Sequence, residues 1–406
     1  MQRRIRGAIG AGAVLASLAL VVAGCTSGGT TDPSAAPADG GVPLTYMDTA
    51  TGECAAGPAE GVDFETAKEY VEQFMRPSEG ITPNILGWDP LPEPIDPNIT
   101  IGYANNMSPV GDGLWRPFIE QAVATAGVNF VNYPAGPDPA SAATGFDSII
   151  ANPPDILIVG AIDPQLVSAQ AQTLVDAGVT IVWGADPKAI DYGFNDTLGG
   201  LGGSIVNGKL LAASAVYFTC GTASEFAWYN IPEFEFSTIN HQAAVEFLAE
   251  LHPNANLRSV DISIFATDNP NGIVQDLQGH PETQFFITPA DQDQVGLAAA
   301  AATAGITNAY GIGQSSLPQN IQQIQEGTQV GGYTLDFQQF NFQLVDEGLR
   351  KYQGVFEGYP DDWELINSNI SSIITKMNVD SLEIGPDSNY YSYPNTVEDY
   401  AEMWGK

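Results

Sequence analysis

Basic residues are scarce in this chain of 406 residues. Its 13 lysines and arginines stand against 48 aspartates and glutamates, which gives a formal net charge of −35. The first 24 residues hold three of the arginines and no acid, so the remainder carries −38. A charge of this sign repels nucleic-acid backbones and anionic lipid headgroups alike. It argues against a nucleic-acid partner and against peripheral binding to a membrane surface.

Histidine and cysteine are also few, with three residues of each. The histidines (His241, His252 and His280) are scattered, and no group of Cys and His has the spacing of a metal site, so we expect no bound metal. The chain also lacks a Gly-x-Ser-x-Gly elbow and a glycine-rich loop followed by Lys-Ser or Lys-Thr. These absences favour a protein that is not an enzyme and holds no cofactor. Acids are abundant enough to leave an exported hydrolase with paired carboxylates as an alternative.

Residues 1–24 have the layout of a secretory signal. Three arginines within the first six residues precede an apolar stretch over 8–23, which is shorter than the roughly 20 residues that a membrane-spanning helix needs. The stretch ends in VAGC, with Cys25 last, and this ending resembles the lipobox of bacterial lipoproteins. The resemblance implies a diacylglyceryl group on the Cys25 thiol and cleavage before it. An ordinary signal peptide or an N-terminal anchor helix is the alternative.

Residues 25–62 begin with a mixture of Gly, Pro, Ser, Thr and Ala that cannot build a core, so we predict a flexible tether there. Cys54 and Cys220 remain once Cys25 is lipidated. An even pair in an exported protein favours a disulfide, here between the N-terminal segment and the main body, and two buried free thiols are the alternative. Residues 63–98 predict a helix capped by Asp63 and then an extended, proline-rich connector.

From residue 99 onward, short apolar strands alternate with helices. Strands are predicted near 99–104, 129–133, 155–159 and 180–183, and then near 227–230, 259–266, 283–288, 308–311 and 330–334. This alternation is typical of parallel sheets covered by helices on both faces. We therefore predict an α/β fold of two Rossmann-like, doubly wound parallel-sheet lobes joined by a hinge. The predicted lobe 1 comprises 99–194 plus 337–356, lobe 2 comprises 195–336 plus 357–380, and 381–406 form an acidic C-terminal tail.

Several stretches carry a more specific pattern. The longest is GFDSIIANPPDILIVGAIDP at 145–164, followed by a helix that ends in DAGVTIVW at 176–183. Three others are NDTLGG at 195–200, PADQDQVG at 289–296 and GYTLD at 332–336. In this order the chain resembles the type I periplasmic solute-binding proteins, the ribose- and galactose-binding family of ABC importers, over residues 99–380. The resemblance implies a ligand held between two closing lobes, with 195–200 and 332–336 as lobe crossings.

Ligands of open α/β sheets bind beyond the carboxyl ends of the strands, which points to candidate residues in the first lobe. Asn105 and Asn106 follow the first strand, and their amides can both donate and accept. By the resemblance, Trp115 falls near the loop aromatics that stack on sugars; otherwise it belongs to the packed face of its helix. Arg116 can grip a carboxylate or hydroxyls, or lie exposed on the helix.

Further candidates follow the later strands. Trp183 is a stacking platform or a residue that only covers the end of the sheet, and Asp186 stands with Ala185 where ribose-binding relatives have an Asp-Arg pair. In the second lobe, Gln314 stands about where relatives have a ligand-binding Asp, and Asp336 lies at the second crossing or caps the helix after it. The remaining candidates of that lobe are Asn240 and Asp291, the latter with a helix cap as its alternative.

Aromatic rings, amides and carboxylates with little positive charge suit a neutral polyhydroxylated ligand or a cation. We therefore expect a lipid-anchored, extracytoplasmic substrate-binding protein that captures a sugar or polyol and delivers it to the permease subunits of an ABC transporter. A sensor of the same fold that signals to a membrane receptor is the first alternative, and the exported hydrolase is the second. The signal and the absence of a basic helix-turn-helix argue against a transcription regulator.

Overall fold

The computed structural model describes residues 44–55, 58–81, 85–108, 110–136, 138–264, 266, 268–307, 310–382 and 389–406. The predicted signal, the predicted lipidation site Cys25 and the first part of the predicted tether, up to residue 43, lie outside the described residues. Among the described residues, no helix has both the length and the apolar character needed to cross a membrane.

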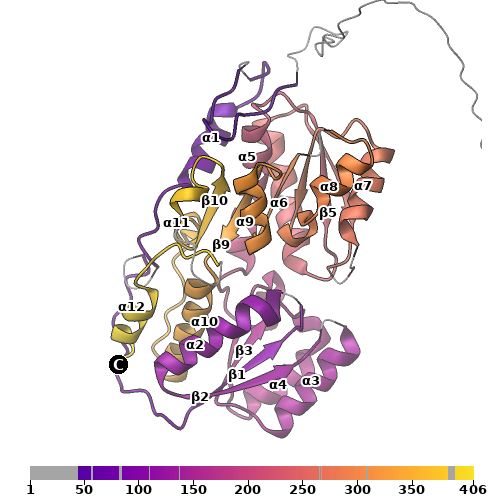
Figure 1. The fold of residues 1–406 in the computed structure, drawn as a ribbon. Helices are drawn as coiled ribbons and strands as arrows, with labels where there is room; N and C mark the ends of the chain where they lie inside the picture. The colour runs from indigo at the N-terminus through magenta and orange to yellow at the C-terminus, as the bar shows by residue number, and fades with distance from the viewer. Residues whose placement is uncertain are drawn as a thin grey trace, which may run out of the picture. The chain divides into compact units, whose positions relative to one another are not determined.

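The first lobe is built on a parallel four-stranded sheet in the order β2-β1-β3-β4. Its strands are β1 (Thr100–Asn105), β2 (Asn129–Pro134), β3 (Ile156–Gly160) and β4 (Thr180–Gly184). Its helices are α2 (Arg116–Ala126), α3 (Pro139–Ala151), α4 (Ser168–Asp176) and the returning α10 (Phe337–Tyr352). Along β3, Ile156 and Ile158 pack with α2 and α10, whereas Leu157 and Val159 pack with α3 and α4. Because successive side chains point to opposite faces, an all-apolar strand needs helices on both sides, as Figure 1 shows.

The second lobe repeats this design with a parallel sheet in the order β6-β5-β7-β8. Its strands are β5 (Glu225–Asn230), β6 (Asn256–Asp261), β7 (Phe285–Thr288) and β8 (Gly311–Gly313). Its helices are α5 (Leu201–Phe218), α6 (Glu235–Leu251), α7 (Asn269–Gly279), α8 (Leu297–Thr303) and α9 (Pro318–Glu326). A parallel bridge from Gln314 to Tyr333 connects β9 (Gly331–Leu335) to this sheet. Strand β9 pairs antiparallel with β10 (Ser371–Thr375), which directly follows α11 (Trp363–Ile370) in the chain. The predicted class of two parallel-sheet α/β lobes is confirmed.

Several element boundaries differ from the prediction. The strand expected over 259–266 ends at Asp261, and the helix α7 that follows was not predicted. Its first turn reads Asn-Pro-Asn-Gly, a composition typical of turns, yet Ile273, Val274 and Leu277 are buried against the sheet and stabilise the helix. Tertiary packing overrides local propensity at this position.

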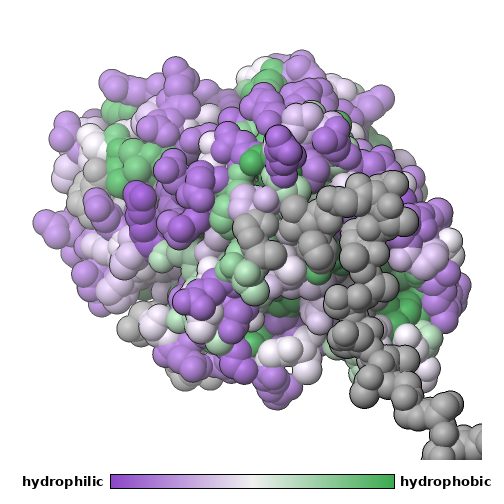
Figure 2. Space-filling model, turned by 90° about the horizontal axis from the view of Figure 1, so that it is seen from above, coloured by the Kyte–Doolittle hydropathy of each residue, from purple (hydrophilic) through white to green (hydrophobic). Residues whose placement is uncertain are grey.

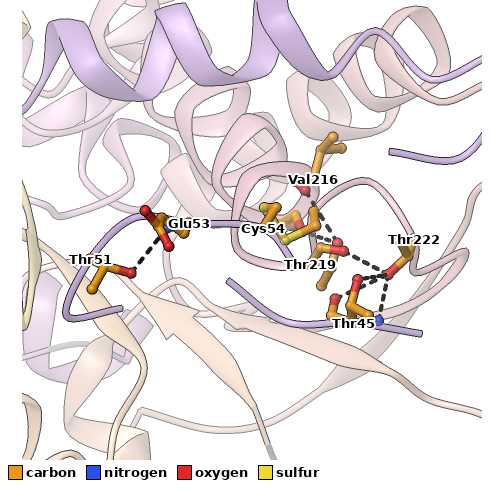
Figure 3. The surroundings of a disulfide bond; sticks show 9 residues. Thr45, Thr51, Glu53, Cys54, Val216, Thr219 and Thr222 are labelled. Carbon is orange, nitrogen blue, oxygen red and sulfur yellow. Dashed lines mark hydrogen bonds between the residues drawn. A yellow bond between two sulfur atoms is a disulfide. The ribbon is translucent and has the colours of Figure 1, made fainter. Parts of the chain in front are cut away.

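The N-terminal segment is fixed to the second lobe well before residue 62, which corrects the predicted extent of the tether. Cys54 and Cys220 form a disulfide at the end of α5, with an S–S distance of 2.05 Å (Figure 3). The buried Met47 donates its backbone N–H to Phe218 O at 2.8 Å, and Thr45 N binds the Thr222 hydroxyl at 2.8 Å. A segment with these contacts is part of the folded body.

The chain then crosses to the first lobe along the elements that join the lobes. Helix α1 (Phe64–Gln73) packs on α5, and the backbone N–H of Glu79 donates to Asn369 Oδ1 at 2.8 Å. Farther on, Leu91 N donates to Met403 O at 2.9 Å. We call residues 44–98 the N-terminal strap.

The segment expected as an acidic tail also packs on the body. It contains α12 (Thr396–Met403), and Tyr400, Met403 and Trp404 lie in the core of the first lobe. The Trp404 indole donates to the buried Asp346 carboxylate at 2.8 Å. The acids of this helix are exposed or half-buried. Figure 2 shows another face of the molecule that is mostly hydrophilic, as expected for the outside of a folded protein.

Candidate ligand-binding site

A cavity of about 90 Å³ lies where the carboxyl ends of the two parallel sheets meet. Loops after β1, β3 and β4 contribute from the first lobe, and loops after β5, β7 and β8 contribute from the second. The remaining lining comes from Ile264 after β6 and from α5, α6, β9, α10 and α11. Since parallel strands end at the same edge of a sheet, the alternation of strands and helices brings the loops of each lobe together at one edge.

The cavity lining carries no carboxylate, ammonium, guanidinium or imidazole group among the described residues. Its side chains fall into three kinds that matter chemically. The aromatic residues are Trp115, Phe234, Phe236, Tyr333, Phe337 and Phe340; the amides are Asn106, Asn207, Gln314 and Asn367; the hydroxyls are Ser108, Ser204 and Ser315. Such a wall binds apolar ring faces and hydrogen-bonding groups, and it offers no counter-ion for a charged ligand.

Backbone strain is concentrated around this cavity. Among described residues other than glycine, Met107, Ala161, Ala185, Cys220 and Ser315 have positive φ. Ala161, Ala185 and Ser315 line the cavity, and Met107 lies between two residues that do. Each of these four follows the end of a strand (β1, β3, β4 or β8). A left-handed backbone at a residue with a Cβ costs free energy, and such residues cluster at functional sites, so the strain independently marks this edge.

The amide of Gln314 is held in one orientation by Asn240. Of the two orientations of the Asn240 side chain, one places its nitrogen 2.8 Å from Phe236 O and 2.9 Å from Ser204 O. Backbone carbonyls only accept, so this orientation satisfies both and turns the Asn240 oxygen toward the end of the Gln314 amide, 2.9 Å away; Gln314 must in turn present its nitrogen there to donate. Gln314 then presents its oxygen as a free acceptor.

Comparison with known proteins identifies the architecture around this cavity. No protein-family model matches the chain, and no curated protein matches its sequence. An ABC transporter solute-binding protein from Burkholderia graminis, in complex with D-arabinose, is similar in structure with a TM-score of 0.59 at 15% identity, over 71% of this chain and 99% of the other. The chain has the fold of the type I periplasmic binding proteins.

Other proteins of this type I fold are similar to the same extent. An ABC transporter solute-binding protein from Agrobacterium vitis with bound allitol has a TM-score of 0.58 at 14% identity, over 70% of this chain and 98% of that one. A protein from Bacteroides fragilis described as a LacI transcriptional regulator has a TM-score of 0.57 at 16% identity, over 70% and 99%. The type I fold therefore occurs in solute-binding proteins and in a protein described as a regulator. The function has to be inferred from the site and not from the fold.

Three of the predicted site residues line the cavity of this type I fold: Asn106, Trp115 and Gln314. Trp115 also packs within the lobe, because its ring lies 4.9 Å from that of Phe340 in an edge-on contact. Trp115 therefore both lines the cavity and belongs to the packed interior of its lobe. Asn106 accepts the backbone N–H of Ser108 at 2.9 Å, which braces the loop after β1.

Asn105 and Arg116 lie beside this loop and not on the cavity wall. The buried Asn105 accepts the N–H of Met107 at 2.9 Å and donates to Asp112 at 3.2 Å, so it shapes the loop. Arg116 is about one-third exposed and pairs with Asp112 at 2.9 Å and Glu120 at 3.2 Å, one helical turn away on either side. Arg116 is the exposed helical residue of the two alternatives.

Trp183 and Asp186 also depart from the predicted role. The Trp183 ring is fully buried on the α3 and α4 side of the sheet, where its indole donates to Ile162 O at 2.8 Å. Asp186 caps the short helix Pro187–Tyr192 by accepting the N–H of Lys188 at 2.9 Å. Burial raises the pKa of the Asp186 carboxyl to about 7.

The three other candidates, Asn240, Asp291 and Asp336, do not line the cavity. Asp336 caps α10 through the N–H of Gln339 at 2.9 Å, which is the alternative that the sequence left open. Asp291 is fully buried but caps no helix: the Ser316 hydroxyl and the Gln329 amide donate to its carboxylate, at 2.5 and 2.9 Å. Asn240 acts on the cavity only through Gln314, as described above.

Sequence reasoning missed most of the aromatic wall. Phe234 and Phe236 follow β5, and Phe337 and Phe340 directly follow the GYTLD stretch, so their places after strand ends were a usable signal. Asn367 gave no such signal, because α11, which carries it, was not predicted. Asn207 and Tyr333 lie within regular elements, where a helix or strand interior normally indicates packing.

Proposed function

We propose that the chain captures a small, neutral, polyhydroxylated solute, a sugar or polyol, between its two lobes. The observation that carries the proposal is the uncharged cavity between the carboxyl ends of two parallel sheets, walled by aromatic rings and amides. A sugar offers C–H faces for ring stacking and hydroxyls for amides. A phosphorylated or carboxylated ligand would lose its hydration without gaining a counter-ion.

Two further observations support a neutral ligand. The solute-binding proteins of similar fold include one with D-arabinose and one with allitol, both neutral. In addition, the carboxylate that directly follows Ala185 does not line the cavity: Asp186 is occupied as a helix cap, while Ala185 does line it. The cation that the sequence left open is the weaker choice, since no acid lines the cavity among the described residues.

Capture depends on closure, in which the ligand stabilises a state with contacts from both lobes. The ion pair between Lys188 of the first lobe and Glu235 at the start of α6 in the second, at 2.8 Å, is such a contact. Trp115 and Phe236 reach the cavity from opposite lobes in the same way. A ligand between them is held from both sides.

We further propose that the protein is an exported lipoprotein that is anchored through Cys25 on the extracytoplasmic face and delivers its solute to ABC permease subunits. The N-terminal sequence pattern supports export and lipidation. Mass spectrometry of the N-terminal peptide should find a diacylglyceryl-modified Cys25. Replacement of Cys25 by Ser should release the protein from the membrane fraction, and an unmodified, uncleaved N-terminus would contradict this part.

A thermal-shift screen of the purified chain tests the capture of solutes. The panel pairs neutral probes (D-arabinose, allitol, D-allose, myo-inositol) with charged ones such as glucuronate and glucosamine. A ligand at about 100 times its Kd raises the unfolding free energy by about 2.7 kcal/mol, so a true ligand gives a clear shift. We expect shifts with neutral probes only, and turnover of a chromogenic glycoside without any shift would favour the hydrolase instead.

Replacing Trp115 by Ala should weaken a bound sugar by about tenfold or more, because a buried aromatic contact contributes about 1–3 kcal/mol. Isothermal titration with the best neutral probe measures the change. Arg116→Ala is the matched control, since Arg116 starts the same helix outside the cavity and should leave the affinity unchanged. Equal affinities of the wild type and Trp115→Ala would remove this ring from the site.

A further inference from the structure

A short chain of hydrogen bonds at the cavity links Tyr333, Asn207 and Asn367. Asn367 of α11 donates through Nδ2 to Gly203 O at 3.2 Å and to Asn207 Oδ1 at 3.1 Å. The Tyr333 hydroxyl of β9 donates to the same Oδ1 at 2.7 Å. The three side chains come from separate elements and are 1–7% exposed, so water competes little for these bonds.

The backbone carbonyl of Gly203 fixes the direction of every bond in this chain. A carbonyl only accepts, so the Asn367 amide must turn its nitrogen toward Gly203, and its second N–H then points to Asn207. Asn207 must receive that N–H with its oxygen. Burial raises the pKa of the Tyr333 phenol above its usual value, so the hydroxyl keeps its proton and donates to the same oxygen.

Two polar atoms of the chain remain without a protein partner among the described residues: Asn207 Nδ2, a donor, and Asn367 Oδ1, an acceptor. Neither atom is sealed from solvent, and both residues line the cavity. A donor beside an acceptor matches a hydroxyl group, which accepts through its oxygen and donates its proton. An ether or carboxylate can only accept and an ammonium can only donate, so each would leave one buried amide atom unpaired, which is costly.

We propose that Asn207 and Asn367 bind one hydroxyl of the ligand as an oriented donor–acceptor pair, and that Tyr333 is the positioning residue that holds this pair. The proposal rests on the proposed capture of a neutral solute and assigns the atoms that recognise its hydroxyl. Tyr333 acts through Asn207, because its own hydroxyl is already engaged. Without that hydroxyl, the Asn207 amide keeps one partner and gains freedom to turn.

The test compares Tyr333→Phe with the wild type by isothermal titration. The probes are whichever of D-arabinose, allitol, D-allose and myo-inositol binds the wild type, together with its monodeoxy derivatives. One derivative should bind the wild type at least tenfold more weakly than its parent, and this identifies the recognised hydroxyl. In Tyr333→Phe we expect the parent to bind about fivefold to tenfold more weakly than it binds the wild type. The ratio of the affinities for the parent and for that derivative should fall toward one, as expected for coupled groups.

Two further variants separate positioning from simple support of the fold. Tyr400→Phe is the matched control: its hydroxyl also donates to a buried amide oxygen, that of Gln343 at 2.6 Å, but lies outside the cavity. It should leave affinity and preference unchanged. Asn207→Asp keeps the shape and both accepted bonds while replacing the free donor by an acceptor, and it should weaken the parent more than tenfold.

The outcomes are distinct. Loss of affinity together with loss of preference in Tyr333→Phe, with both kept in Tyr400→Phe, supports the proposal. An unchanged profile, or an equal loss for the parent and every deoxy derivative, overturns it, since the latter is what a purely structural tyrosine would give. If the wild type binds none of the neutral probes, the proposed function itself fails and the role of the pair fails with it.

Discussion

At the scale of single residues, the protein keeps several carboxylates buried without a basic partner. Asp291 is the clearest case: it is fully buried beneath Gln314 and Ser315, and its hydrogen bonds come from Ser316 and Gln329. Burial raises its pKa to about 7, with Asp293 adding to the effect and the two hydrogen bonds opposing it. No basic residue pairs with Asp291 among the described residues, so burial outweighs the two hydrogen bonds in setting its pKa.

A raised pKa in the folded state lowers stability at high pH. The folded protein binds a proton at Asp291 up to about pH 7, whereas the unfolded chain releases it near the ordinary aspartate pKa of 3.8. The unfolding free energy therefore falls as pH rises between these values, by up to about 1.4 kcal/mol per pH unit for this group. We predict that the wild type is more stable at pH 5 than at pH 8, and that Asp291→Asn shrinks this difference.

Urea denaturation at the two pH values measures it. The exposed Asp361→Asn serves as the control and should keep the full difference. A difference of the same size in Asp291→Asn and the wild type would show that this carboxyl does not titrate as its burial requires.

The residue scale also shows where sequence reasoning stops. Trp115 and Trp183 both lie near strand ends, and the period of two in a strand puts Trp183 on the same face as Ile181. However, β4 is buried on both faces, so its sequence does not tell which face meets α10 and the cavity and which meets α3 and α4. The site could be predicted to lie at the strand ends, but the direction of each ring depends on packing.

At the scale of elements, the most distinctive addition to the two lobes is the N-terminal strap. Its start is joined to the end of α5 by the Cys54–Cys220 disulfide, and its later part binds the first lobe, where Arg350 donates to Asp89 O at 2.9 Å. Between these ends, Ser78 donates to Asn369 O at 2.5 Å beside the elements that join the lobes. The strap is therefore attached to both lobes, and the disulfide adds a covalent link to its packing on the second lobe.

We predict that Cys54→Ser/Cys220→Ser lowers the unfolding free energy by about 2–5 kcal/mol, because the bond closes a loop of 166 residues in the unfolded chain. Thermal and urea unfolding measure the change. Proteolysis should also begin near residues 44–62, since without the disulfide only non-covalent contacts, such as the hydrogen bond from Met47 N–H to Phe218 O, hold this part of the strap. Reducing agent should lower the wild type to the level of the variant and leave the variant unaffected; equal stability of the two oxidised proteins would contradict the prediction.

Element prediction succeeded where the apolar pattern was dense and failed where short segments gain stability from distant contacts. The strands of both sheets were found because runs such as Ile156–Gly160 are continuously apolar. The acidic composition of residues 381–406 predicts a tail where helix α12 lies, although Tyr400, Met403 and Trp404 have the spacing of one helical face. Its partner surface, on α10 and α2, is about 50 or more residues away in sequence, so no local pattern could place it.

At the scale of the whole molecule, the charge of −35 opposes any closure that brings the two lobes together. The facing groups show the problem: Asp163 and Asp186 lie near Lys188 on the first lobe, and Glu235 meets it from the second. A single ammonium thus stands among three carboxyls. Its ion pair is about one-third exposed, so the contribution to closure is modest and sensitive to salt.

Replacement of Lys188 by Ala should therefore weaken the bound solute by about twofold to fivefold, as for an exposed ion pair of 0.2–1 kcal/mol. The remaining acids would then repel across the closing interface, so added salt should restore affinity in the variant by screening them. Titration of the best neutral probe at about 0.05 and 0.5 M NaCl measures both effects.

Lys209→Ala is the matched control, because Lys209 is equally exposed and pairs with Glu364 at 3.4 Å, between two helices of the second lobe. It should leave the affinity and its salt dependence unchanged. If Lys188→Ala and Lys209→Ala respond alike, the charge between the lobes does not govern closure, and the ligand must hold the lobes together through the aromatic and amide wall alone.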